Sequence, residues 1–177
     1  CIIYDNGFTH YRNICIKVKG LHERMESIWW YIFDIMGTLA FAVSGVLVAV
    51  SKRMDLFGIF VLAASTAIGG GIIRDLILGH TPPIALQSSL YFFLIIAAML
   101  GTTAMIRYFD AHIRSKVMHH SAYIYLAGDT IGLASFTITG TLSGLYFNPD
   151  MWVLIIMLGV ITAVGGGVIR DVLAGKV

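Results

Sequence analysis

The string GGGIIRD at residues 69–75 and its near copy GGGVIRD at 165–171 decide how this sequence folds. Each string places three glycines and an arginine–aspartate pair near the end of a long apolar run. A glycine inside a helix costs about 1 kcal/mol relative to alanine, and charged side chains are costly wherever the surroundings are lipid. Because the whole string occurs twice, we expect both copies to serve the same purpose.

The composition around these strings is that of a membrane protein. Hydrophobic residues make up 58% of the 177 residues and charged residues 12%, whereas soluble domains have about 45–50% and about 25%. A helix needs about 20 apolar residues to span the bilayer, and the amphipathic outer helices of a soluble bundle are not found. We therefore predict an all-α polytopic membrane protein, with helices over 28–50, 56–79, 84–107, 122–147 and 151–175.

An internal repeat relates residues 34–79 to residues 129–175. DIMGTLAFAVSG at 34–45 matches DTIGLASFTITG at 129–140, and TAIGGGIIRDLILG at 66–79 matches TAVGGGVIRDVLAG at 162–175. Three crossings end on the face of the membrane opposite to the one where they began. The second copy therefore starts from the opposite face. The sequence thus predicts inverted repeats of three transmembrane helices, as in many transporters, with the second copy truncated.

The chain divides into four segments on this reading. Residues 1–27 are interpreted as an extra or misassigned segment, because 1–24 lack the apolar core of a signal peptide and Met25 precedes a sharp change in composition. The first repeat is expected over 28–107 and a cytoplasmic loop over 108–121. The second repeat is expected over 122–177, without its sixth and seventh helices.

Basic residues orient the chain, since Lys and Arg are enriched in cytoplasmic loops. The predicted loops on one side hold five Lys and Arg residues. The loops on the other side are poor in Lys and Arg, with His80 in one and Asp150 in the other. We expect the region near Met25 outside and the basic loops in the cytoplasm. The basic residues are Lys52, Arg53, Arg107, Arg114 and Lys116.

The glycines are candidates for a kink that lines or gates a pore. Without side chains, they allow a helix to unwind and expose carbonyl groups that could coordinate a cation. The alternative is close helix packing alone. The candidate residues are Gly69, Gly70, Gly71, Gly165, Gly166 and Gly167.

Charged and hydroxyl side chains form the rest of the candidate site. Ionisable residues inside a membrane indicate function, although a helix-end arginine can snorkel and a lone carboxylate can cap a helix. We expect the charged residues to pair with one another or to attract cations. They are Arg74, Asp75, Arg170, Asp171, Asp34 and Asp129. Ser44 and Thr139 are expected either to line the pore or to permit close packing.

Other classes of function lack support in the sequence. The helices contain no paired-glutamate, Ser-His-Asp or His-x-x-x-His arrangement, so we do not expect an enzyme. His119 and His120 have no further ligands beside them, and Cys1 and Cys15 lack metal-ligand spacing, so no metal or cofactor is expected. The net charge of +2, with no basic patch that includes aromatics, gives no reason to expect a nucleic-acid partner.

These motifs resemble the prokaryotic trimeric intracellular cation channel family, whose repeated domain is also called a glycine transporter domain. The resemblance is carried by GTLAFAVSGVLVA, KRMDLFGIFVLA and TAIGGGIIRDLILG with their second copies, over about residues 28–175. It implies seven helices, glycine-broken second and fifth helices that line a pore in each protomer, a homotrimer, and residence in a prokaryotic plasma (inner) membrane.

Three functions remain open at this point. The first is a channel that passively conducts potassium or sodium. The second is a carrier of glycine or another small amino acid, which would use half-helix ends to bind substrate. The third is a non-conducting membrane scaffold in which the glycines serve packing alone.

The predicted orientation can be tested by cysteine labelling from outside intact cells. A cysteine placed at position 53 or 114 should resist a membrane-impermeant reagent, because both positions are expected in the cytoplasm. A cysteine at position 148 should react. The reverse pattern would overturn the topology.

Overall fold

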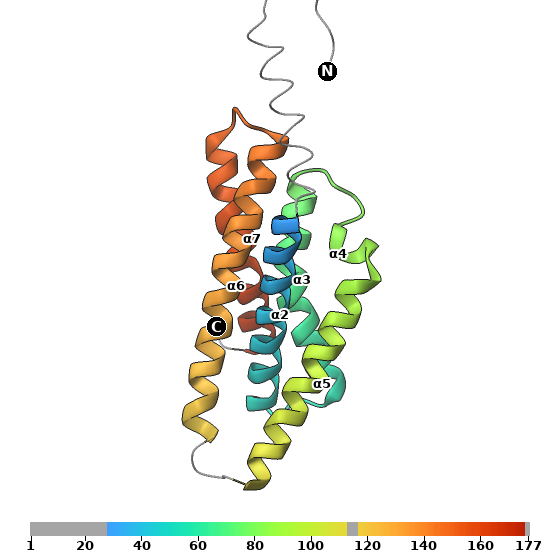
Figure 1. Ribbon diagram of the computed structural model, residues 1–177, viewed down its shortest axis with the longest axis vertical. Helices are drawn as coiled ribbons and strands as arrows, with labels where there is room; N and C mark the ends of the chain where they lie inside the picture. The colour runs from blue at the N-terminus through green and yellow to red at the C-terminus, as the bar shows by residue number, and fades with distance from the viewer. Residues whose placement is uncertain (1–27, 113–116, 176–177) are drawn as a thin grey trace, which may run out of the picture.

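The computed structural model describes residues 28–112 and 117–175, and every regular element in these ranges is a helix (Figure 1). The all-α fold is thereby confirmed. Residues 1–27, Arg114 and Lys116 lie outside the described residues. The helices are α2 (Ile28–Ser51), α3 (Leu56–Ile77), α4 (Ile84–Gln87), α5 (Ser89–His112), α6 (Val117–Phe147) and α7 (Trp152–Leu173).

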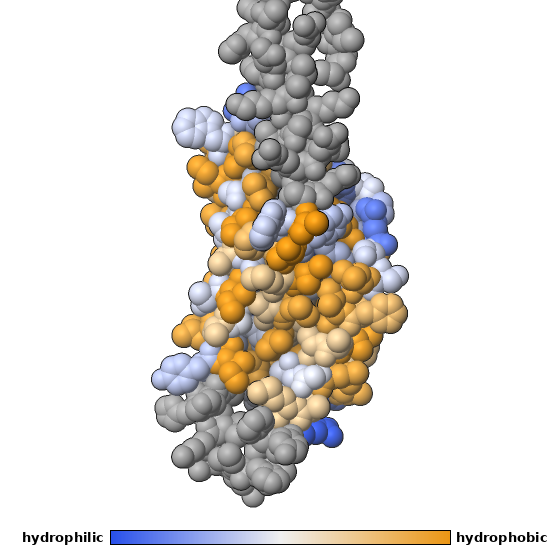
Figure 2. All heavy atoms as spheres, in the orientation of Figure 1, coloured by the Kyte–Doolittle hydropathy of each residue, from blue (hydrophilic) through white to orange (hydrophobic). Residues whose placement is uncertain are grey.

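Four helices are long and apolar enough to cross a membrane: α2, α3, α5 as far as Arg107, and α7. Figure 2 shows apolar residues over the middle of one face, with hydrophilic ones nearer the ends. The described part of α6, predicted as a fifth span, does not reach the same hydropathy. Polar residues such as Ser135, Thr139 and Ser143 lower the mean hydropathy of α6. These three side chains are buried inside the protein.

Two phenylalanines show that the halves of the chain are related by a two-fold rotation. A Cβ atom at Gly37 would lie 2.6 Å from the ring of Phe136, and one at Gly132 would lie 2.7 Å from the ring of Phe41. The two rings themselves pack with centroids 5.3 Å apart. Since α2 and α6 run in opposite directions (Figure 1), the rotation axis crosses the helices. The predicted inverted repeat is confirmed.

The same symmetry brings the triple glycines of α3 and α7 together. A Cβ atom at Gly70 would lie 2.1 Å from the carbonyl oxygen of Thr162, and one at Gly166 would lie 2.3 Å from that of Thr66. Real side chains cannot approach so closely, so the two backbones touch only because these residues are glycines. The spacing of Thr66 to Gly70 and of Thr162 to Gly166 is the small-xxx-small pattern of membrane helix pairs.

The expected break in the second and fifth helices is not found. Helix α3 continues from Leu56 to Ile77 and α7 from Trp152 to Leu173, through both triple glycines. Backbone groups in a bilayer must be hydrogen-bonded within the protein, and this requirement outweighs the low helix propensity of glycine. The glycines therefore shape the contact between two continuous helices.

The third predicted helix is divided into two pieces. Pro83 caps α4, which ends after one turn, and Ser88 adopts an extended conformation with φ −106° and ψ 120° before α5 begins. The connection expected over 108–121 is also shorter, because α5 continues to His112 and α6 begins at Val117.

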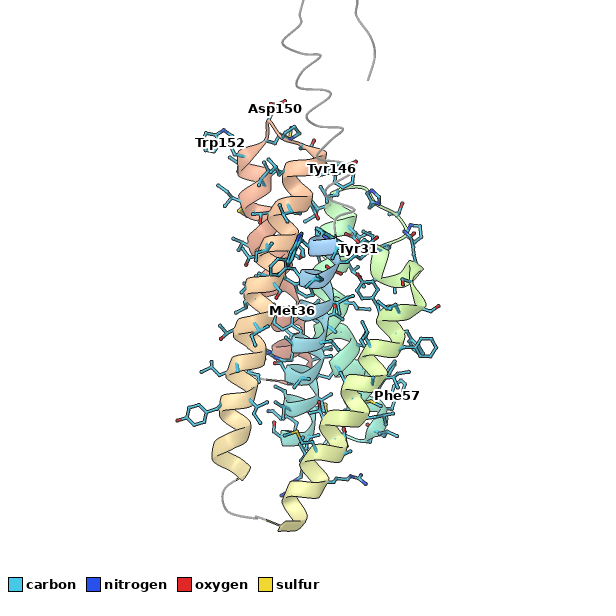
Figure 3. The ribbon with its side chains drawn as sticks, in the orientation of Figure 1. Tyr31, Met36, Phe57, Tyr146, Asp150 and Trp152 are labelled. Atoms are coloured by element: carbon cyan, nitrogen blue, oxygen red, sulfur yellow. The ribbon has the colours of Figure 1, made fainter. Side chains whose placement is uncertain are left out.

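The loops gather at two opposite ends of the bundle. The ring of His80, after α3, packs 4.9 Å from that of Phe147 at the end of α6, and Asp150 and Trp152 lie at this end (Figure 3). Lys52 and Arg53 follow α2 at the other end, towards which α5 also runs (Figure 1). The basic residues of the described loops are thus segregated from His80 and Asp150.

Gly70→Ala should destabilise the protein, whereas Gly71→Ala in the same triple glycine should be tolerated. A Cβ at Gly70 overlaps the Thr162 carbonyl group, but the nearest atom to a Cβ at Gly71 is an Arg74 nitrogen at 3.8 Å. Overpacking costs about 1–3 kcal/mol, whereas an unhindered alanine gains up to about 1 kcal/mol of helix propensity. Thermal unfolding in detergent measures both. Equal midpoints for the two variants would show that α3 and α7 do not touch at Gly70.

Candidate functional site

The Arg74 cluster is a buried group of charged and aromatic side chains from α2 and α3. Arg74 donates from Nε to Asp75 at 2.8 Å and from Nη1 to Asp34 at 3.2 Å. Its guanidinium carbon lies 5.1 Å from the ring centre of Trp30. The arginine is 2% exposed, so it does not snorkel to the surface. Carboxylates and an aromatic face together replace its hydration shell.

Two further donors complete the Arg74 cluster. The hydroxyl group of Tyr91, from α5, donates to the second oxygen of Asp34 at 2.5 Å. The backbone N–H of Ile84, at the start of α4, donates to the second oxygen of Asp75 at 2.8 Å. Both carboxylates are therefore held on both oxygens, and the break between α4 and α5 lies beside the residues that hold them.

The Arg170 cluster is the symmetry-related group on α6 and α7. Arg170 donates to Asp171 from Nε at 2.9 Å and from Nη2 at 3.2 Å. Its Nη1 donates to Asp129 and, at 2.7 Å, to the hydroxyl oxygen of Ser44. The ring centre of Tyr125 lies 4.9 Å from the guanidinium carbon. The arginine is again 2% exposed, whereas the side chain of Asp171 is 40% exposed.

The two clusters lie toward opposite ends of the bundle and have the same formal charge. Arg74 lies in the last turn of α3 and Arg170 in the last turn of α7, and these helices run in opposite directions (Figure 1). Each cluster contains one arginine and two aspartates, so each carries one negative charge in excess. Charge of this sign favours cations at both ends of the α3–α7 contact.

The glycines and hydroxyl groups of the candidate site separate into two groups. Gly69, Gly70, Gly165 and Gly166 lie in the contact between α3 and α7, while Gly71 and Gly167 lie beside Arg74 and Arg170 of their own helices. Ser44 contacts Arg170, but Thr139, its equivalent in the repeat, donates to the carbonyl oxygen of Phe136 at 3.4 Å. The structure therefore brings Ser44 to the Arg170 cluster and four of the glycines to the contact between α3 and α7, whereas Thr139 bonds within its own helix.

Three aromatic residues of the clusters were missed by sequence reasoning. Trp30 and Tyr125 are equivalent in the repeat and precede Asp34 and Asp129 by four residues, which places each pair on one helix face. That spacing is a signal that could have found them. Tyr91 has no such signal, because only the tertiary structure brings α5 beside Asp34. Among the described residues, no group of three His, Cys, Asp or Glu side chains is placed to hold a metal ion.

Continuous apolar helices, an in-plane two-fold relation and paired buried charges together define a polytopic membrane protein built from inverted repeats. The family model described as "Glycine transporter" matches residues 31–107 and 126–177, which are the two repeats. A Vibrio cholerae "UPF0126 membrane protein" is 43% identical over 83% of this chain and 58% of its own length. The Escherichia coli "UPF0126 inner membrane protein YadS" is 38% identical over 83% of this chain and 67% of its own length.

Solved structures identify the same fold. The TRIC trimeric intracellular cation channel orthologue from Rhodobacter sphaeroides is 35% identical, with a TM-score of 0.68 over 82% of this chain and 70% of that chain. A prokaryotic TRIC channel in 0.5 M KCl is 28% identical, with a TM-score of 0.71 over the same shares of the two chains. The chain belongs to the prokaryotic TRIC channel family. It spans 58% of the length of the Vibrio relative.

Tyr91→Phe should lower the stability of the protein. The substitution keeps the ring but removes the donor to a buried oxygen of Asp34, and an unmet buried acceptor costs about 1–3 kcal/mol. Thermal unfolding in detergent measures the loss. Tyr123→Phe, at a side chain 70% exposed, is the control and should leave the midpoint unchanged. If both variants unfold together, Tyr91 does not stabilise the Arg74 cluster.

Proposed function

We propose that the protein is a passive channel for monovalent cations, potassium or sodium, with a pore in each protomer of a homotrimer. It resides in the plasma (inner) membrane of a prokaryote, with its basic loops in the cytoplasm. The observation that carries this proposal is the pair of Arg–Asp clusters, one toward each end of the α3–α7 contact and each with one negative charge in excess.

The charge arrangement suits cation conduction. Carboxylates at each end of a path raise the local cation concentration and disfavour anions. The arginine beside these carboxylates carries a permanent positive charge. This charge repels a cation in the path until the arginine side chain moves away. The six charged residues named from the sequence thus act as cation-attracting groups and as gates, and Ser44 and Thr139 supply hydroxyl groups to the path.

The contact between α3 and α7 lies between the two clusters and closes the path in this conformation. In this contact Gly69 and Gly165 face isoleucine side chains of the opposite helix, whereas Gly70 and Gly166 face backbone carbonyl groups. A small separation of the helices would therefore expose backbone to the path. Gly71 and Gly167 leave room beside the arginines. In this proposal the glycines are pore-lining residues of continuous helices rather than kinks.

The relatives support a channel and name one competing function. The similar solved proteins are described as cation channels and one as trimeric, while the family model is described as a glycine transporter. A carrier for glycine or another small amino acid would bind its substrate at half-helix ends. Both α3 and α7 are continuous through the triple glycines, so these ends are not available there, which favours the channel. The relatives' descriptions as membrane proteins and channels also favour a non-enzymatic role.

Flux through purified protein in liposomes separates the three candidate functions. A channel should give potassium efflux that rises linearly with the concentration gradient. A carrier should give glycine uptake that saturates with concentration. Liposomes with neither flux would identify a scaffold and overturn the proposal. The control is the Gly70→Ala protein, which should lose flux together with its correctly folded fraction.

A further inference from the structure

The break between α4 and α5 lies alongside α3 and not beyond its far end. The ring of Phe92, in the first turn of α5, has its centre 6.1 Å from that of Phe60. Phe60 lies in the second turn of α3, and α3 begins just after Lys52 and Arg53. The extended residue Ser88, one turn before Phe92, therefore lies within the length of α3, as Figure 1 also shows.

A cavity of about 410 Å³ lies between this break and α3. Its volume is within the range of about 300–1,000 Å³ that is usual for sites that bind small molecules. One wall is a row of residues spaced by four on a single face of α3, and the other wall comes from α4 and the start of α5. The apolar residues of the two walls include Phe60, Ala64, Ile68, Leu86, Phe92 and Ile95.

Three of the four polar side chains that line the cavity are hydrogen-bonded within the protein. Gln87 donates to a backbone carbonyl oxygen at 2.5 Å, and the Ser88 hydroxyl group accepts from a backbone N–H group at 3.3 Å. The Tyr91 hydroxyl group donates to Asp34, so its ring remains to face the cavity. The fourth, Ser89, is exposed. The cavity therefore favours an apolar occupant over a polar solute.

The cavity lies where lipid surrounds the protein. Both α3 and α5 as far as Arg107 are long and apolar enough to span a membrane. Leu86, Phe92 and Phe93 of the lining are exposed, and Figure 2 shows apolar residues over the middle of the face on which α5 lies. The walls of an empty cavity lose dispersion contacts. A hydrocarbon chain from the surrounding bilayer can restore these contacts without displacing any hydrogen bond.

We infer that this cavity is a binding site for one alkyl chain of a bilayer phospholipid. The chain lies along Ala64 and Ile68 of α3 and against the aromatic rings at the start of α5. It links the first turn of α5 to α3 where the two helices do not pack directly against each other. The inference goes beyond the proposed channel function and holds whether or not the protein conducts cations.

A photoactivatable phospholipid tests the site on the full chain in liposomes. The probe is phosphatidylcholine with a diazirine midway along one alkyl chain, added as a minor component to phosphatidylethanolamine–phosphatidylglycerol vesicles. Peptide mass spectrometry locates its adducts. We expect Ile68, which is half-buried, to be labelled as strongly as Val61, which is exposed on the same helix outside the cavity. Ala64→Leu fills the cavity and should lower the yield at Ile68 several-fold while the yield at Val61 stays constant.

The matched control is Ala104→Leu, the same substitution at an exposed residue of α5 outside the cavity. Its labelling should equal that of the unaltered protein. Thermal unfolding in detergent shows whether each variant folds. If Ala64→Leu does not fold, Ile68→Phe occupies the same space, and the loss of adducts is then measured at Ala64.

Three results would overturn the site. The first is an unaltered protein labelled at Val61 but not at Ile68; if Phe92 and Phe93 are also unlabelled, a second copy of this chain covers the cavity. The second is an equal yield at Ile68 in the Ala64→Leu and Ala104→Leu proteins. The third is rapid reaction of an Ile68→Cys protein in liposomes with a charged maleimide, because such a reagent reaches position 68 only through water.

Discussion

The contact of α3 with α7 at Gly70 and Gly166 is the constraint on which the rest of the structure depends. In lipid, helices gain little from burying apolar side chains against each other, so close approach must supply the attraction. Here each glycine faces the carbonyl oxygen of a threonine on the opposite helix. The Cα–H bonds point at these oxygens, an arrangement worth about 0.5–1 kcal/mol per contact. A single methyl group at either position would separate the helices.

This contact also fixes where the arginines lie. Arg74 follows Gly70, and Arg170 follows Gly166, by one helical turn, which places each arginine on the contact face of its helix. Because the two helices are antiparallel, one arginine emerges beyond each end of the contact. Neither side chain can reach water without leaving the face on which the helices meet, so each must be neutralised within the protein. The neighbouring carboxylates satisfy that requirement.

The carboxylates in excess of the arginines also need hydrogen-bond donors. In the first repeat the break after α4 brings the Ile84 N–H and the Tyr91 hydroxyl group to the carboxylates. In the second repeat, Arg170 donates to both of its carboxylates and also to the Ser44 hydroxyl oxygen of the other repeat.

The amino-acid sequence alone is enough to predict the membrane class, the long helices, the inverted repeat and the charged residues of both clusters. The length of an apolar run and the recurrence of a motif are both visible in the amino-acid sequence, so they can be recognised without a structure. The continuity of the helices through GGG cannot be predicted from the helix propensity of glycine, because the facing helix that requires these glycines is not visible in the sequence. The one-turn α4 and the break at Ser88 were missed for a similar reason.

The groups that complete the clusters can be identified only from the packing of the helices. Tyr91 and Ser44 are 57 residues from Asp34 and 126 residues from Arg170, respectively, and no periodicity links residues so far apart. Their pairing depends on how α5 and α2 pack against the glycine-bound pair of helices. The identity of the charged residues is therefore a property of the sequence, whereas their attachment is a property of the packing, because a hydrogen bond depends on distance in space and not along the chain.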